Sequence, residues 1–290
     1  MPFAICLIER FSMKLGYGTY AMPTIDIFEA LPRLRDIGYE AVEINVGDDW
    51  PTAPHKLSAS DRGRLVNTLQ DLNYPPPVIM CLLPICTQGD TRESVLKKFD
   101  AACALANDLN FEETPIPLVS TPGGIHGDWE ENKNQLRDSL LFIADQAAKH
   151  NVIFAIEPHA GQMLDTPDKV AWLMKQTQHE HLKVNFDISH FHVIDIDLQH
   201  SVNLCAPYTV STHVKDGYMK DGKVHYQLPG DGTLDLLAYF KALSAAGITC
   251  PVTVEVTAQI WRQDGYDPWV AAEKSFKALA QAKKQAGIDK

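Results

Sequence analysis

The chain has 290 residues, 45% of them hydrophobic, which is enough to build one large buried core and excludes a small disulfide-stapled scaffold or a disordered chain. Its 26 Lys and Arg residues against 37 Asp and Glu residues give a formal charge of −11, so a protein that binds the phosphate backbone of nucleic acids is not expected.

The sequence carries no membrane or export signal that we can identify. No apolar run reaches the roughly 20 residues that a membrane helix needs, and Glu9 and Arg10 end the apolar stretch at residues 5–8. We therefore expect neither a membrane span nor a signal peptide. The six cysteines form no Cys-x-x-Cys pair, a pattern typical of reduced thiols in a cytoplasmic protein.

Apolar runs rich in Val and Ile alternate with amphipathic stretches from residue 13 onwards, which is the rhythm of a parallel sheet with crossover helices. Residues 1–12 precede the first run, and we expect them to form an N-terminal extension that adds little to the fold. Strands are predicted at 15–20, 41–46, 78–83, 116–120, 152–157, 182–187, 209–214 and 252–256. Helices are predicted at 25–37, 92–110, 129–150, 166–177, 197–204, 234–246 and 268–286.

Eight predicted strands that alternate with helical patterns favour an α/β fold, a single (β/α)₈ TIM barrel over residues 13–290. The alternative is a doubly wound open sheet. Against it, the segment Gly16-Tyr17-Gly18-Thr19 lacks the third glycine of a dinucleotide-binding turn. No proline-rich or low-complexity linker divides the chain, so we predict one catalytic domain.

Polar side chains end four strands in succession, where catalytic groups of such a barrel are found. These side chains are Glu157, Asp187, His213 and Glu255. Each alone is explained equally well as a helix cap or a partner for a lysine. Together they bring three carboxylates to one mouth, which is unfavourable unless a cation neutralises them. An oxygen-rich set with one nitrogen suits Mn²⁺, Mg²⁺ or Co²⁺.

The segments around these residues resemble a known family. They are Glu157-Pro158, Asp187-Ile188-Ser189-His190, His213-Val214-Lys215-Asp216, Pro229-Gly230-Asp231-Gly232-Thr233, and Glu255 on the last strand. From Met13 onwards the chain is similar to the sugar phosphate isomerase/epimerase family of xylose isomerase-like barrels, which includes ketose 3-epimerases and inosose dehydratases.

The resemblance implies a cofactor, a substrate contact and an assembly. One divalent ion, Mn²⁺ in the first place with Mg²⁺, Co²⁺ or Zn²⁺ as alternatives, would be ligated by Glu157, Asp187, His213 and Glu255. His190 would hold an oxygen of a carbohydrate substrate, and the chain would form a homodimer or tetramer. The endonuclease branch of the superfamily uses a larger His-rich set that this chain lacks, which argues against a role on DNA.

A metal at this site makes the C–H bond next to a substrate carbonyl acidic and stabilises the resulting enediolate. With Glu157 and Glu255 as the catalytic acid and base, the site predicts an isomerase or epimerase of a keto sugar or sugar derivative. A leaving group β to the carbanion would instead give a lyase, such as an inosose-type dehydratase or an enzyme that cleaves C-glycosides or 3-keto-glycosides. The second alternative is a non-catalytic or partner-dependent sugar-binding subunit.

Further side chains are assigned to substrate binding, each with a structural alternative. Lys215 lies two residues after His213 and should point inward, to the substrate or to Glu255. The alternative is a salt bridge with Asp216 or another carboxylate at the barrel rim. His159 is either a pocket residue or a loop histidine that bonds a carbonyl. Trp129 and Trp261 either stack an aromatic face against the sugar or pack into the core at the barrel end. Ends of the first two strands add the candidates Tyr17, Glu43 and Asn45, with rim hydrogen bonds as the alternative.

Overall fold

The computed structural model describes residues 13–85, 91–112, 117–122 and 126–288. The predicted extension at residues 1–12 lies outside these ranges. Among the described residues, no helix is both long and apolar enough to cross a membrane. The described cysteines are free thiols, of which Cys81, Cys103 and Cys205 are buried.

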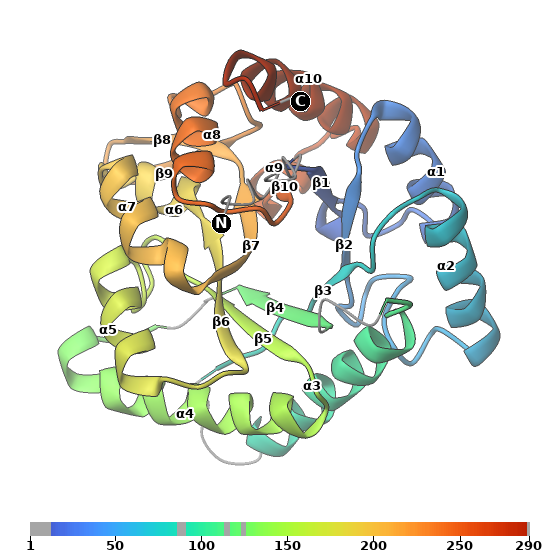
Figure 1. Ribbon diagram of the computed structural model, residues 1–290, viewed down its shortest axis with the longest axis horizontal. Coiled ribbons are helices and arrows are strands. Elements are labelled where there is room, and N and C mark those ends of the chain that lie inside the picture. The colour runs from blue at the N-terminus through green and yellow to red at the C-terminus, as the bar shows by residue number, and fades with distance from the viewer. Residues whose placement is uncertain (1–12, 86–90, 113–116, 123–125, 289–290) are drawn as a thin grey trace, which may run out of the picture.

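The described strands close into a parallel barrel with helices around it, which confirms the predicted (β/α)₈ fold (Figure 1). Going round the barrel, the order is β1-β10-β7-β6-β5-β4-β3-β2. The strands span β1 (Leu15–Gly18), β2 (Ala41–Asn45), β3 (Val78–Met80), β4 (Leu118–Pro122), β5 (Ile153–Glu157), β6 (Leu182–Asp187), β7 (Thr209–Val214) and β10 (Val252–Val254). Each strand lies within one or two residues of its predicted position or inside it.

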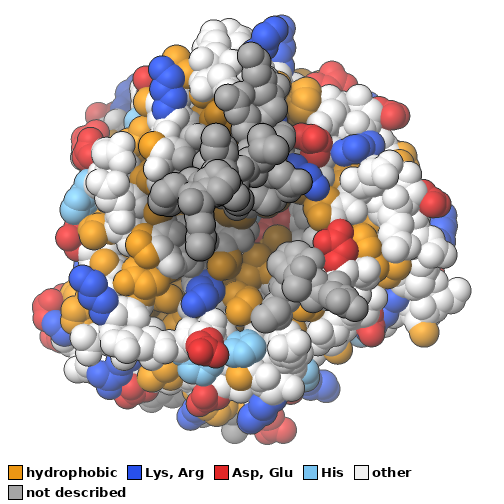
Figure 2. Space-filling model, viewed as in Figure 1, with side chains coloured by type: hydrophobic (Ala, Val, Ile, Leu, Met, Phe, Trp, Pro, Cys, Tyr) orange, Lys and Arg blue, Asp and Glu red, His pale blue; other side chains and the backbone are white. Residues whose placement is uncertain are grey.

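Helices form the outer ring, and α10 lies beside α1 where the ring closes (Figure 1). They are α1 (Ile27–Ile37), α2 (Ala59–Asp71), α3 (Thr91–Asp108), α4 (Trp129–Lys149), α5 (Pro167–Thr177), α6 (Ile188–His192), α7 (Leu198–Cys205), α8 (Leu236–Ala245), α9 (Ala258–Trp261) and α10 (Pro268–Gln285), with 3₁₀ turns at η1 (Thr19–Ala21) and η2 (Ala206–Tyr208). Charged side chains are spread over these helices, whereas hydrophobic side chains show in the hollow near the centre of this face (Figure 2).

Local sequence signals explain where the helices begin and end. Thr166 caps α5 by accepting a hydrogen bond from the backbone N–H of Lys169 at 3.3 Å, and Pro167 occupies the first turn, where its missing N–H is harmless. Gly38 follows α1 with a φ of 122°, a conformation that favours glycine.

Alternation along the strands separates an outer apolar layer from an inner polar one. On β1, Gly18 faces the interior, because a Cβ there would meet Glu43 Oε1 at 3.5 Å. Tyr17 therefore points outward. Its ring packs 5.1 Å from that of Tyr39, whose hydroxyl donates to the Ala272 carbonyl on α10 at 2.9 Å. This placement corrects the prediction that Tyr17 lines the substrate pocket.

A β-hairpin of β8 (Asp216–Lys220) and β9 (Lys223–Gln227) follows β7 and stands apart from the barrel sheet. The Asp216 carboxylate stabilises the base of this hairpin. It accepts hydrogen bonds from the backbone N–H groups of Gly217 at 2.8 Å, Gly230 at 3.1 Å and Leu234 at 2.9 Å. A Cβ at Gly232 would lie 2.2 Å from Asp216 Oδ1 and 2.5 Å from the Gly217 nitrogen. Only glycine fits against this carboxylate.

Replacing Gly232 with Ala should therefore lower the free energy of unfolding by about 2–4 kcal/mol, because the added methyl group collides with backbone and with a fully engaged carboxylate. Chemical denaturation followed by circular dichroism measures this loss. The matched control is Gly63→Ala on the exposed face of α2, where nothing lies within 4 Å of the added Cβ. That variant should gain up to about 1 kcal/mol from helix propensity, and equal stabilities for the two variants would contradict the steric argument.

Candidate metal centre and active site

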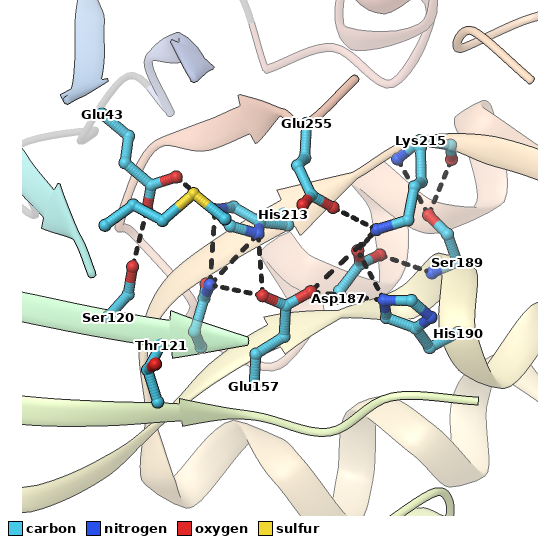
Figure 3. Close-up of polar contacts among 12 residues, drawn as sticks. Glu43, Ser120, Thr121, Glu157, Asp187, Ser189, His190, His213, Lys215 and Glu255 are labelled. Atoms are coloured by element: carbon cyan, nitrogen blue, oxygen red, sulfur yellow. Dashed lines mark hydrogen bonds and ion pairs between the residues drawn. The ribbon is translucent and has the colours of Figure 1, made fainter. Parts of the chain in front are cut away.

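The C-terminal ends of β5, β6 and β10 bring three carboxylates together at the mouth of the barrel (Figure 3). Glu157 ends β5, Asp187 ends β6, and Glu255 follows β10 directly. All three side chains are buried. One oxygen from each lies within 4.8 Å of the others and of a ring nitrogen of His190. Three of the four residues that were predicted from the strand ends therefore lie in one cluster.

His190 supplies the nitrogen of this cluster because a short helix begins at the end of β6. Asp187 caps α6 by accepting a hydrogen bond from the Ser189 N–H at 2.8 Å, and the turn brings His190 back over the carboxylates. His190 Nε2 lies 3.3 Å from Glu157 Oε1 and 3.6 Å from Asp187 Oδ2. Burial lowers the pKa of His190 well below its usual value, so the ring is neutral.

His213, predicted as a metal ligand, lies beside the cluster and not in its four-atom group. Its Nε2 is 2.8 Å from Glu43 Oε1, and its Nδ1 is 3.2 Å from Glu157 Oε2. Burial by itself lowers the pKa of His213, but the two carboxylates outweigh it and raise the pKa well above the usual value. In this arrangement His213 is a cation that bridges β2 and β5. Its role as a ligand stays a prediction.

Glu43 holds His213 from the opposite side of the ring. Its second oxygen accepts a hydrogen bond from the Ser120 hydroxyl at 2.9 Å, and the Asn185 amide lies 3.2 Å from His213 Nδ1. Glu43 is predicted either to line the pocket or to form a hydrogen bond at the barrel rim. It is buried and contacts His213 (Figure 3).

Lys215 lies at the centre of the carboxylates. Its ammonium contacts Asp187 Oδ2 and Glu255 Oε2 and is 4.0 Å from Glu157 Oε1. Burial by itself lowers the pKa of Lys215, but these carboxylates raise it well above the usual value. The predicted pairing with Glu255 is confirmed. The alternative salt bridge is formed with Asp187 and not with Asp216, whose carboxylate accepts hydrogen bonds from backbone N–H groups.

The donor set fits a divalent cation. Two buried atoms that face each other, Glu157 Oε1 and His190 Nε2, have no hydrogen-bond partner. A cation between them would satisfy both, because carboxylate oxygens and a neutral imidazole nitrogen are donors that Mn²⁺, Zn²⁺ and similar ions accept. Glu157, Asp187, His190 and Glu255 are the residues that would hold it.

Tyr226 is a site residue that strand ends do not reveal, because it comes from the hairpin. Its hydroxyl lies 2.6 Å from His190 Nδ1, and its ring lies 5.4 Å from the Lys215 ammonium. The turn Asp221-Gly222, with φ of 50° and 71°, is the sequence signal of a tight hairpin and could have located β9.

The remaining predicted contacts divide between the site and the outer layer. The His159 ring packs 3.8 Å from that of His190, and its Nδ1 lies 2.9 Å from the Ala160 carbonyl, as expected of a loop histidine. Its contact with a substrate stays a prediction. Trp261 packs edge-on against Tyr20 at 5.7 Å. Trp129 packs edge-on against Trp172 at 5.2 Å, between α4 and α5, as the core-packing alternative expects.

A family model described as "Xylose isomerase-like TIM barrel" matches residues 31–282. The chain belongs to the xylose isomerase-like TIM barrel family. Within this family, a curated 3-dehydroshikimate dehydratase from Bacillus anthracis is 23% identical over 207 residues, which cover 68% of this chain and 71% of that protein.

Solved structures share the barrel at low identity. D-psicose 3-epimerase from Clostridium cellulolyticum H10 superposes with a TM-score of 0.75 at 15% identity, over 94% of this chain and 99% of that one. The IOLI protein, solved with a bound zinc atom, superposes with a TM-score of 0.76 at 18% identity, over 95% and 98% of the two chains. The chain also spans 43% of a longer xylose isomerase-like TIM barrel/4-hydroxyphenylpyruvate dioxygenase fusion protein. These likenesses establish the fold.

In a chelating buffer, the contribution of Glu157 to the free energy of unfolding should fall between pH 5 and pH 8. Burial raises the pKa of Glu157 from 4.5 to about 7, with Glu255 adding to the rise and His213 opposing it. Because the folded state holds this proton more tightly than the unfolded state, the stabilisation is complete below pH 4.5 and is lost as the pH rises through 7. The loss amounts to about 3 kcal/mol.

Glu157→Gln should remove this part of the pH dependence, since an amide does not titrate. Urea denaturation at pH 5 and pH 8 in EDTA measures it, with Glu273→Gln on the exposed side of α10 as the matched control. Parallel pH profiles for wild type and Glu157→Gln would show that the Glu157 carboxyl has an ordinary pKa.

Proposed function

We propose that this protein is a divalent-metal-dependent isomerase or epimerase that removes a proton next to the carbonyl group of a keto sugar or sugar derivative. The observation that carries the proposal is the buried cluster of three carboxylates and one neutral imidazole at the barrel mouth. Mn²⁺ is the ion we prefer, with Mg²⁺, Co²⁺ and Zn²⁺ as alternatives. When bound, the ion would polarise the substrate carbonyl and stabilise the negative charge that develops as the proton leaves.

Glu157 is the residue that we assign as the base. Glu157 ends β5 at the cluster, and before any ion is bound burial raises the pKa of this carboxyl above its usual value, which strengthens it as a base. His213 holds one oxygen of this carboxylate at 3.2 Å, and the other oxygen faces the cluster with no hydrogen bond, 3.3 Å from His190 Nε2 and 4.0 Å from the Lys215 ammonium. This leaves one oxygen oriented to accept a substrate proton.

Glu255 is the second acid–base residue. It follows β10, and β7 and β6 lie between that strand and β5, so Glu157 and Glu255 approach the cavity from different sides. A carboxylate on each face of the substrate allows one to remove a proton and the other to return it. That arrangement supports epimerisation, and return of the proton to the adjacent carbon gives isomerisation.

Two other side chains would orient the substrate. Lys215 brings a positive charge beside Glu255, suited to an oxygen that gains negative charge. His190 has two assignments that depend on His213. If His213 takes the ligand position that the family resemblance implies, then His190 holds a substrate oxygen. The grouping of His190 with the three carboxylates supports the other assignment, in which His190 would be the nitrogen ligand.

A dehydratase is the second candidate, favoured by the proton donors grouped on one side of the cluster. The Lys215 ammonium lies over the Tyr226 ring, and the Tyr226 hydroxyl contacts His190. These groups could protonate a hydroxyl that leaves from the carbon β to the carbonyl after Glu157 takes the α proton, which releases water and leaves a C=C bond. The similarity to a 3-dehydroshikimate dehydratase supports this reading.

Proton exchange with solvent tests the shared first step. In D₂O with Mn²⁺ or Mg²⁺, keto sugars, keto-inositols, 3-keto-glycosides and 3-dehydroshikimate are incubated with the protein and followed by NMR. We expect deuterium at the carbon next to the carbonyl of at least one of them, only with metal. Glu157→Gln and Glu255→Gln should each slow exchange about 10²–10⁴-fold, whereas the exposed control Glu273→Gln should not.

The product then separates the candidates. An epimer or isomer supports the first candidate, and an eliminated product supports the dehydratase. Absence of exchange with every compound would overturn the enolising site and favour a sugar-binding or partner-dependent subunit.

A further inference from the structure

We propose that Lys215 is a built-in competitor of the metal, whose ammonium occupies the cation position between Asp187 and Glu255 and must swing away before a divalent ion can bind them. This inference rests on the metal centre of the proposed function and adds a device that sets its affinity. The carboxylate oxygens that Lys215 contacts, Asp187 Oδ2 and Glu255 Oε2, lie in the cluster that would hold the ion (Figure 3).

Hydrogen bonds hold the backbone of Lys215, whereas its ammonium is held only by ion pairs. The Ser189 hydroxyl donates to the Lys215 carbonyl at 2.7 Å and accepts from its N–H at 2.9 Å, which fastens the residue just beyond β7. The side chain beyond Cα has four rotatable bonds, so the ammonium can move while the backbone stays. Rotation of the side chain can therefore move the ammonium while the Lys215 backbone stays in place.

Charge balance explains why the ammonium lies where it does. Asp187, Glu157 and Glu255 are all buried, and an unpaired buried carboxylate is strongly unfavourable. The ammonium contacts two of these carboxylates and lies 4.0 Å from the third. Its single charge is placed among the same three carboxylates that a divalent ion would bind.

The two cations cannot share these oxygens. A divalent ion at the cluster would lie within a few ångströms of the ammonium, where like charges repel strongly at low dielectric. The Tyr226 ring, 5.4 Å from the ammonium, offers a nearby cation–π surface to receive it. Metal binding therefore exchanges one cation for another, and the affinity for the metal is weakened by the work of moving Lys215.

Metal titration tests the competition directly. Isothermal calorimetry with MnCl₂ is performed at one fixed pH on the full chain and on Lys215→Met, Lys215→Gln and Lys215→Arg, with Lys241→Met on the exposed side of α8 as a control of equal net charge change. Loss of the competing charge should tighten Mn²⁺ binding about tenfold or more in the Met and Gln variants. The Arg variant should bind no more tightly than wild type, and the control should match wild type.

Thermal unfolding gives a second measure that does not depend on activity. In EDTA, Lys215→Met should melt below wild type, because three buried carboxylates lose their cation, and saturating Mn²⁺ should raise its melting temperature by more than it raises that of wild type. The Gln variant keeps a hydrogen-bond donor, and the Arg variant keeps the charge, so the comparison stands even where the Met variant does not fold in EDTA.

The outcomes distinguish this inference from the proposed function. Equal Mn²⁺ affinities for wild type and the uncharged variants, or tighter binding by Lys215→Arg, would overturn the competition and leave the metal centre intact. No Mn²⁺ binding by any of the proteins would overturn the metal centre and the competition together.

Discussion

Three carboxylates are buried side by side at the end of the barrel, and much of the surrounding chemistry answers the repulsion between them. Water cannot screen Glu157, Asp187 and Glu255, so each must be matched by a proton, a hydrogen bond or a cation. The protein uses all three. Burial raises the pKa of Glu157 to about 7, so this carboxyl binds a proton more readily than an exposed one, the Ser189 amide donates a hydrogen bond to Asp187, and the Lys215 ammonium contacts Asp187 and Glu255.

The balance between burial and nearby charges makes one of two neighbouring histidines cationic and leaves the other neutral. His213 lies between the Glu43 and Glu157 carboxylates and is held as a cation. His190 lies close to the Lys215 charge as well as to carboxylates, and burial keeps it neutral. A cationic ring fixes a carboxylate, whereas a neutral ring can donate a lone pair. The two histidines therefore differ in charge because their partners differ, with His213 held between two carboxylates and His190 packed against His159.

Sequence reasoning was sufficient for the barrel and for the strand ends. Period-two alternation predicts that Glu157, Asp187 and His213 point inward, and they do. Tyr17 was misplaced because its segment was read as a strand end, whereas the parity set by Gly18 turns it outward. Which histidine joins the cluster depends on side-chain rotation and on Glu43, 170 positions away from His213, and no local pattern encodes that pairing.

The β8–β9 hairpin also bears on how such a protein can diverge. It leaves the barrel at Asp216, is fastened there by backbone hydrogen bonds, and is tied to α9 through Gln259, yet it contributes no strand to the barrel sheet. Mutations in the hairpin can therefore reshape the wall over His190 without repacking the core. Within the proposed site, the carboxylates come from the ends of barrel strands, whereas Tyr226 comes from a hairpin outside the barrel sheet.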